Sequence, residues 1–138
     1  MITGRCYCGG ARVTSPAPVQ TVAYCHCGDC RRVTGAPVTA FAAVARDSVQ
    51  FAGKVTKASH SEGVTRWFCH ACGSPLLAEF AYLPDQSYLP LGILDQAPDL
   101  TPSLHCYAEA GMPWLKIDDD LERTTDSGAA TLQAAADV

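Results

Sequence analysis

Seven of the eight cysteines lie in three short clusters, and this spacing constrains the fold more than any other feature of the sequence. The clusters are Cys6-Tyr7-Cys8, Cys25-His26-Cys27-Gly28-Asp29-Cys30 and Cys69-His70-Ala71-Cys72. Cysteines so close together can bind one zinc ion as thiolates, with zinc–sulfur distances of about 2.3 Å. Seven thiolates exceed the ligands of one tetrahedral ion and fall one short of filling two. We therefore expect one closed metal site and one three-cysteine site with an open position.

An even number of cysteines is also typical of a disulfide framework in a small secreted protein. The first residues, MITGRC, contain neither the apolar segment nor the cleavage site of a signal peptide, so we expect a reducing, cytoplasmic location. Two cysteines separated by one residue would also form a strained ring if they bridged, whereas both can reach one metal ion. The spacing therefore favours metal sites over disulfides.

The size and charge of the chain limit its partners. With 138 residues it is long enough for one domain that buries about two thirds of its unfolded surface. No apolar run approaches the ~20 residues that cross a bilayer, so we expect no membrane partner. The formal net charge is −4, and the basic residues are scattered apart from Arg31 and Arg32, which argues against nucleic acid as a partner.

Glycines and prolines divide the sequence into short segments rich in β-branched and aromatic residues. This pattern predicts a mainly β domain, with strands over 11–14, 19–24, 39–44, 49–51, 64–68 and 75–82, and a helical turn over 28–34. From residue 125 the chain lacks aromatic residues and is rich in alanine, serine, threonine and aspartate. We therefore expect one domain over 1–124 and a flexible or weakly helical tail over 125–138.

The cysteine motifs and their flanking residues resemble the glutathione-dependent formaldehyde-activating enzyme family, also called the GFA or centromere-protein-V domain family. The segments that carry the resemblance are 4–10, 25–35 and 68–76, with further similarity in 90–95 and 105–121. The family's fold is the Mss4-like β-tent, built from short antiparallel strands, which agrees with the strand pattern. The resemblance implies two zinc sites, a structural one and a catalytic-type, labile one. Their ligands would be Cys6, Cys8, Cys69 and Cys72 in the structural site, and Cys25, Cys27 and Cys30 in the catalytic-type site.

The resemblance further implies a carbon–sulfur lyase that joins glutathione to formaldehyde. Three thiolates weaken the Lewis acidity of zinc, so a site of this kind is better suited to exchange a thiol than to make hydroxide from water. A thiol such as glutathione could take the open position and attack a small aldehyde. Arg31 and Arg32 could pair with a carboxylate of glutathione, or could equally be surface charges on a short turn.

Three alternatives remain open at this point. The chain could be a non-catalytic, zinc-stapled binding module on the same β-tent, as in the guanine-nucleotide-exchange relative after which the fold is named. An exposed thiolate cluster could also serve redox chemistry or metal buffering. The second zinc could instead be structural, with a fourth ligand from Cys106, His26 or His105.

Other notable side chains have simpler expected roles. His26 lies between two predicted ligands, and in an extended segment its side chain points away from the metal, either supporting the site or reaching the surface. We expect Cys106, Trp67 and Trp114 in the core. The acidic run 118–120 is expected to be a solvated turn.

Overall fold

The computed structural model describes residues 1–137, which form a mainly β structure, as predicted. The strands are β1 (Ile2–Arg5), β2 (Ala11–Ser15), β3 (Thr21–Cys25), β4 (Thr39–Ala45), β5 (Gln50–Gly53), β6 (Val55–Ser61), β7 (Val64–Cys69), β8 (Pro75–Phe80), β9 (Gln86–Pro90), β10 (Leu104–Cys106) and β11 (Glu122–Arg123). The α-helices are α1 (Gly28–Thr34) and α2 (Ala129–Ala136), and three short 3₁₀ turns are η1 (Leu91–Ile93), η2 (Ala97–Asp99) and η3 (Ala108–Ala110).

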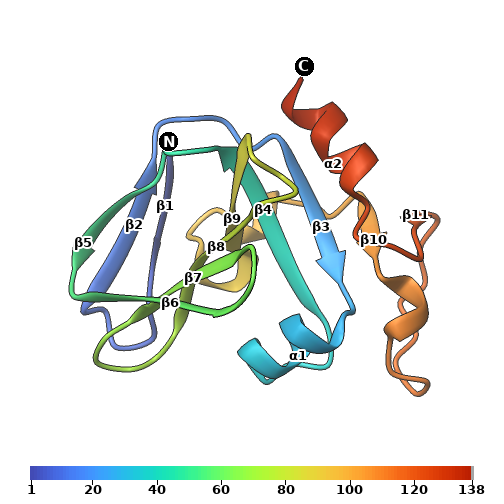
Figure 1. Cartoon of the computed structure of the whole chain (residues 1–138), viewed down its shortest axis with the longest axis horizontal. Coiled ribbons are helices and arrows are strands. Elements are labelled where there is room, and N and C mark those ends of the chain that lie inside the picture. Colours follow the sequence, from blue (N-terminus) through green and yellow to red (C-terminus); the bar gives the residue numbers. More distant parts are fainter. Residues whose placement is uncertain (138) are drawn as a thin grey trace.

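The strands make two sheets (Figure 1). The smaller sheet has the order β1-β2-β5, and the larger has the order β11-β10-β3-β4-β9-β8-β7-β6. The pairs are antiparallel, as expected, except that β10 runs parallel to both of its neighbours, β3 and β11. Parallel strands need a crossover connection, and β3 and β10 are separated in the chain by most of the large sheet.

Strand β4 is buried on both faces because it separates two hydrophobic clusters. Successive side chains of a strand point to opposite faces. Ala42 and Val44 face the cluster that includes residues of the small sheet. Phe41 and Ala43 face a second cluster, which contains Cys30, Cys106 and Leu132. The near-continuous apolar sequence of this strand fits a position buried on both sides.

The C-terminal segment packs against this second cluster through α2, which Figure 1 shows beside β10. Leu132 is only 4% exposed, and its carbonyl oxygen accepts a hydrogen bond of 2.9 Å from Gln86 Nε2. The composition after residue 124 predicts a flexible or weakly helical tail. Because of the buried Leu132, we propose that α2 is instead an integral part of the domain.

The two α-helices are short, with seven residues in α1 and eight in α2. No helix among residues 1–137 has the length and apolar character that crossing a bilayer requires.

Candidate metal centres and adjoining cavity

The first cysteine set gathers between the β1–β2 turn and the β7–β8 turn. The four sulfurs of Cys6, Cys8, Cys69 and Cys72 lie within 4.8 Å of one another. Cys6 Sγ is 3.5 Å from Cys8 Sγ, which is 3.7 Å from Cys69 Sγ. Zinc–sulfur bonds of about 2.3 Å correspond to sulfur–sulfur edges of about 3.8 Å in a regular tetrahedron. The four sulfurs therefore have a spacing that one tetrahedral metal ion can use, and the donor set is compatible with zinc.

Tight turns hold these cysteines in place. The chain reverses direction at Gly9 in one turn and at Gly73 in the other. Their φ angles are 78° and 76°, a left-handed conformation that glycine adopts without steric cost. The Ala11 amide donates a hydrogen bond of 3.3 Å to Cys6 Sγ. An amide donor favours the thiolate form that a metal ion requires. The two turns come from sequence positions about sixty residues apart, so a shared metal ion would close a long loop.

The second cysteine set forms where β3 leads into α1. The sulfurs of Cys25, Cys27 and Cys30 lie within 4.8 Å of one another. Cys25 ends β3, Cys27 caps the N-terminus of α1, and Cys30 lies in its first turn. Cys27 Sγ accepts a hydrogen bond of 3.3 Å from the Cys30 amide and is 3.4 Å from Cys25 Sγ. The helical turn predicted over 28–34 is confirmed as α1, and it turns the third cysteine back toward the other two.

Negative charge in this second set concentrates on Cys27. Hydrogen bonds from the thiols of Cys25 and Cys30, together with the amides of Cys30 and Asp29, lower the pKa of Cys27 to about 2. The contact with Cys27 in turn raises the pKa of Cys25. The three groups share protons as one unit, and a metal ion that binds all three would displace the remaining protons.

The suggested fourth protein ligands do not join this set within residues 1–137. Cys106 is aligned with Cys25 in the parallel β3–β10 pair, but its sulfur packs against Gly128, where a Cβ would come within 3.1 Å. Burial raises the pKa of Cys106 to about 12, so it remains a thiol at neutral pH. Its predicted core position is confirmed, with 4% exposure. The side chains of His26 and His105 bond to each other instead.

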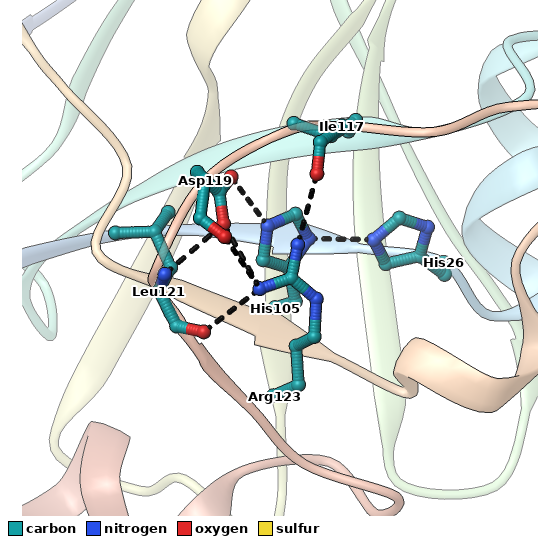
Figure 2. A network of polar contacts seen from close by, with 6 residues as sticks. All are labelled: His26, His105, Ile117, Asp119, Leu121 and Arg123. Atoms are coloured by element: carbon teal, nitrogen blue, oxygen red, sulfur yellow. Dashed lines mark hydrogen bonds and ion pairs between the residues drawn. The ribbon is translucent and has the colours of Figure 1, made fainter.

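His26 and His105 belong to a chain of polar contacts that ends at Asp119 and Arg123 (Figure 2). His26 Nε2 is 2.8 Å from His105 Nδ1, and His105 Nε2 is 2.9 Å from Asp119 Oδ2. Arg123 lies 3.0 Å from Asp119 Oδ1 and donates to backbone carbonyls of the 117–121 loop. The prediction that 118–120 is simply a solvated turn is therefore wrong for Asp119, because its carboxylate binds the buried His105.

The Asp119 carboxylate orients the His105 ring at one end of this chain of contacts. The Asp119 carboxylate accepts the hydrogen bond from His105 Nε2, and in the His105 tautomer with its proton on Nε2, Nδ1 would accept from His26 Nε2. Burial and the neighbouring His105 lower the pKa of His26, which favours its neutral form. The hydrogen bond from His105 lowers the pKa of Asp119, which favours its charged form. Since His26 lies between Cys25 and Cys27, the chain of contacts fixes the loop that carries two of the three clustered cysteines.

The second cysteine set opens into a cavity of about 340 Å³, whereas the first set does not line it. Most of the wall is aromatic or aliphatic. Side chains from β4, β8, β9, α2 and the β8–β9 loop supply it, namely Phe41, Phe80, Leu83, Tyr88 and Leu132. The charged lining residues are Asp29 and Arg66.

Two tyrosines, Tyr82 and Tyr107, line the same cavity as the cysteines. Tyr82 is half exposed, and Tyr107 adopts a left-handed backbone conformation with a φ of 51°, which is uncommon for a bulky residue. Burial is the main cause that raises the pKa of both hydroxyls. Both therefore keep their protons at neutral pH and can donate hydrogen bonds into the cavity.

A smaller cavity of about 160 Å³ adjoins the first one, and we call it the basic groove because three of its lining side chains are basic. Arg32 and His60 line this groove, while Asp29, Val64 and Arg66 line both cavities. Arg32 and Arg66 have no ion-pair partner within residues 1–137. They can therefore offer positive charge to a ligand that extends from the cysteine cavity.

The arginine pair that follows the second cysteine set lies on α1. Both guanidinium groups turn back toward Gly28, where a Cβ would be 3.0 Å from Arg32 Nη1 and 3.8 Å from Arg31 Nη2. Arg31 Nε is buried and has no hydrogen-bond partner in the described part of the chain. The role of Arg31 and Arg32 in binding a carboxylate remains a prediction.

The two tryptophans differ from each other. Trp67 is partly buried and packs against the first core cluster, with its ring 6.2 Å from the Phe51 ring, so its predicted core position is confirmed only in part. The prediction for Trp114 is wrong, because its side chain is 69% exposed. It lies in the irregular segment between η3 and β11, which supplies no neighbouring strand to cover it.

The main residues that sequence reasoning missed are Asp119, Arg66, Tyr82 and Tyr107. They come from separate loops and strands, and none belongs to a motif with the cysteines. A sequence signal exists only for Tyr107, which directly follows the candidate ligands His105 and Cys106.

Comparisons with known proteins agree with this geometry. Residues 1–110 match the family model "Glutathione-dependent formaldehyde-activating enzyme". Among curated proteins, none matches the chain. A crystal structure of a Rhodobacter sphaeroides protein is similar, with a TM-score of 0.56 and 21% identity over 67% of this chain and 87% of that chain. This likeness concerns the fold alone. Because the family model matches most of its length, the chain belongs to the glutathione-dependent formaldehyde-activating enzyme family, GFA.

Proposed function

We propose that this protein is a zinc-dependent enzyme of the carbon–sulfur lyase type, which joins a thiol such as glutathione to a small aldehyde or splits their adduct. One observation carries the proposal: all three cysteines of the second set line one largely apolar cavity, whereas Cys6 alone of the four-cysteine set lines a cavity, a separate one of about 460 Å³. A metal site that must admit a substrate needs an open position and access, while a structural site needs neither. The description of the family supports the same reaction.

The two cysteine sets then have different roles. Cys6, Cys8, Cys69 and Cys72 would hold a structural zinc ion that staples two distant turns. Cys25, Cys27 and Cys30 would hold the second zinc ion in the reactive site. When bound there, zinc supplies a Lewis acid that favours the thiolate form of an incoming thiol at neutral pH.

The surrounding side chains would orient the two substrates. Arg32 and Arg66 border the basic groove, and they would bind a carboxylate of the thiol substrate, with Arg31 beside them. Tyr82 and Tyr107 would donate hydrogen bonds to the carbonyl oxygen of the aldehyde. The apolar wall would exclude water from the reacting groups.

The reaction is an addition without oxidation or reduction. The sulfur lone pair forms a carbon–sulfur bond to the carbonyl carbon, the π electrons move to the carbonyl oxygen, and that oxygen takes a proton. The thiol supplies one proton overall, so thiol plus aldehyde gives a hydroxyalkyl thioether. The reverse steps split the adduct.

A reducing compartment suits this chemistry. All eight cysteines are free in the structure. Thiolates that bind metal are kept reduced in the cytoplasm, so we propose that location for the protein.

Exchange NMR can test the activity. The zinc-loaded protein should accelerate the interconversion of glutathione plus formaldehyde with S-hydroxymethylglutathione, and Cys30→Ser should remove most of the acceleration. Cys106→Ser is the matched control, because Cys106 lies on the same cavity but outside the three-cysteine set. Equal rates for the two variants, or no acceleration by wild type, would argue against the proposal.

A further inference from the structure

The cavity beside the three cysteines is much larger than formaldehyde. Its volume is about 340 Å³. An apolar cavity of about 150 Å³ is large enough to hold benzene. Formaldehyde has two heavy atoms and would leave most of the apolar wall without contacts. The space therefore fits an aldehyde with a substantial side chain.

The inner wall is suited to an apolar group. Leu83 is 1% exposed, Leu132 is 4%, Tyr88 is 5% and Phe41 is 7%, so each already belongs to the hydrophobic core while lining the cavity. The hydroxyl of Tyr88 is bonded to Gln86. What this part of the wall presents is therefore ring and methyl surface, which favours apolar contacts.

The aromatic rings around Phe80 favour a flat ligand group in the cavity. The Phe80 ring centroid is 5.7 Å from that of Tyr88 at an interplanar angle of 67°, and 5.5 Å from that of Tyr82 at 40°. Rings arranged edge-to-face and tilted in this way offer both faces and edges to another ring. A planar, aromatic side chain can use this arrangement better than a polar chain of similar size.

Apart from the three clustered cysteines, the charged side chains lie on one side of the cavity. Asp29 and Arg66 are its charged lining residues, and both also line the basic groove. The Arg66 guanidinium lies 5.7 Å from the Phe80 ring centroid, at the boundary between the two cavities. A carboxylate of the thiol substrate would therefore lie near Arg66, and the rings remain for an apolar group of the second substrate.

We infer that the preferred aldehyde carries an aromatic or branched apolar group, which rests among Phe41, Phe80, Leu83 and Tyr88. This inference rests on the proposed function, in which the thiol uses the basic groove. It assigns the apolar cavity to the aldehyde side chain.

Binding of an unreactive analogue tests the inference without relying on turnover. Benzyl alcohol and methanol are titrated separately into ¹⁵N-labelled, zinc-loaded protein. Benzyl alcohol should shift the amide signals of Leu83 and Tyr88, and should reach half-saturation at a concentration at least about tenfold lower than methanol, since burying a ring contributes well over the 1.4 kcal/mol that tenfold requires. Equal midpoints, or shifts remote from the cavity, would overturn the inference.

Two variants localise the binding. Tyr82→Ala removes a half-exposed ring from the rim and should weaken benzyl alcohol binding, whereas Tyr7→Ala, a matched change at an 89% exposed tyrosine beside the first cysteine set, should not. Val64→Glu places a charge on the wall and should also weaken binding. Unchanged binding in both cavity variants would overturn the inference even if benzyl alcohol binds wild type.

Turnover separates this inference from the proposed function. With glutathione held constant, kcat/KM for benzaldehyde should exceed that for formaldehyde by about tenfold or more. A preference for formaldehyde would contradict the inference and leave the proposed function standing. Failure of both aldehydes to react would instead contradict the proposed function, and the assignment of an aldehyde to the cavity with it.

Discussion

His26 Nε2 lies 2.8 Å from His105 Nδ1, and this contact links the loop between Cys25 and Cys27 to strand β10. The backbone links the same two segments a second time, because the His26 amide donates a hydrogen bond of 3.1 Å to the Cys106 carbonyl oxygen. Asp119 holds the far side of the His105 ring (Figure 2). His105 and Asp119 therefore position the loop that bears Cys25 and Cys27, although neither residue is a member of the three-cysteine set.

Asp119→Ala should loosen the second metal site. Without the carboxylate, His105 Nε2 loses its acceptor and the His26 ring loses its fixed partner. Changing residues that support a metal ligand shell typically lowers metal affinity by about 10–100-fold, and we expect the second metal to be released faster by a similar factor. The measurement is the rate of metal transfer to a chromogenic chelator.

Asp118→Ala is the control for this variant, because the neighbouring Asp118 is exposed and lies outside the chain of contacts. The release rate from Asp118→Ala should equal that of wild type. If Asp119→Ala releases its second metal at the wild-type rate, or loses both metals equally, the positioning role is wrong.

Cys69→Ser should destabilise the whole fold. The buried Cys69 brings the β7 turn into the four-cysteine set, and structural zinc contributes on the order of 10 kcal/mol to folding. We expect the variant to lose the first metal and its cooperative thermal transition, as measured by metal analysis and circular dichroism. A variant that keeps its metal and melts within a few degrees of wild type would contradict the assignment.

A mild chelator should remove one metal ion before the other. The three-cysteine set faces a cavity, so a chelator can approach it, whereas the other set has four protein ligands. We expect loss of about one equivalent of zinc while the β-sheet circular dichroism signal persists. Simultaneous loss of both equivalents and of the signal would indicate that the two sites are not distinct in this way.

Leu132→Ala should destabilise the protein if α2 belongs to the domain. Leu132 is 4% exposed and lies in the second core cluster, and removing such a buried leucine side chain costs about 2–5 kcal/mol. The exposed neighbour Thr131 provides the control Thr131→Ala. Chemical denaturation should separate the two variants; equal stability would mean that the segment is the flexible tail expected from its composition.

The fold and the cysteine sets could be predicted because their signals are local. Paired cysteines, turn residues and β-branched segments are read over a few positions, and α1 was found in this way. The sequence pattern does not predict strands β6 and β9. Strand β6 is mostly polar and largely exposed, and β9 begins with the polar Gln86 and Ser87, which are buried through hydrogen bonds. Such strands are determined by their neighbours in the sheet.

The supporting residues of the site could not be predicted for the same reason. Asp119 and His105 meet only because the 111–121 segment folds back across β10, and no periodic pattern encodes that return. Tyr82 reaches the cavity from the loop after β8. The buried residue of α2 is Leu132, which lies in an alanine-rich segment. The composition of that segment by itself predicts a tail.

Titration of glutathione into the cobalt-substituted protein is the most direct test of the central claim, that the three-cysteine site accepts a thiol. As a fourth sulfur joins the metal, the visible absorption of one cobalt equivalent should change and saturate. Arg31→Ala combined with Arg32→Ala should shift the midpoint to higher glutathione concentration if a carboxylate is bound. A spectrum that is unchanged at millimolar glutathione would contradict the enzyme proposal and favour a zinc-stapled binding module.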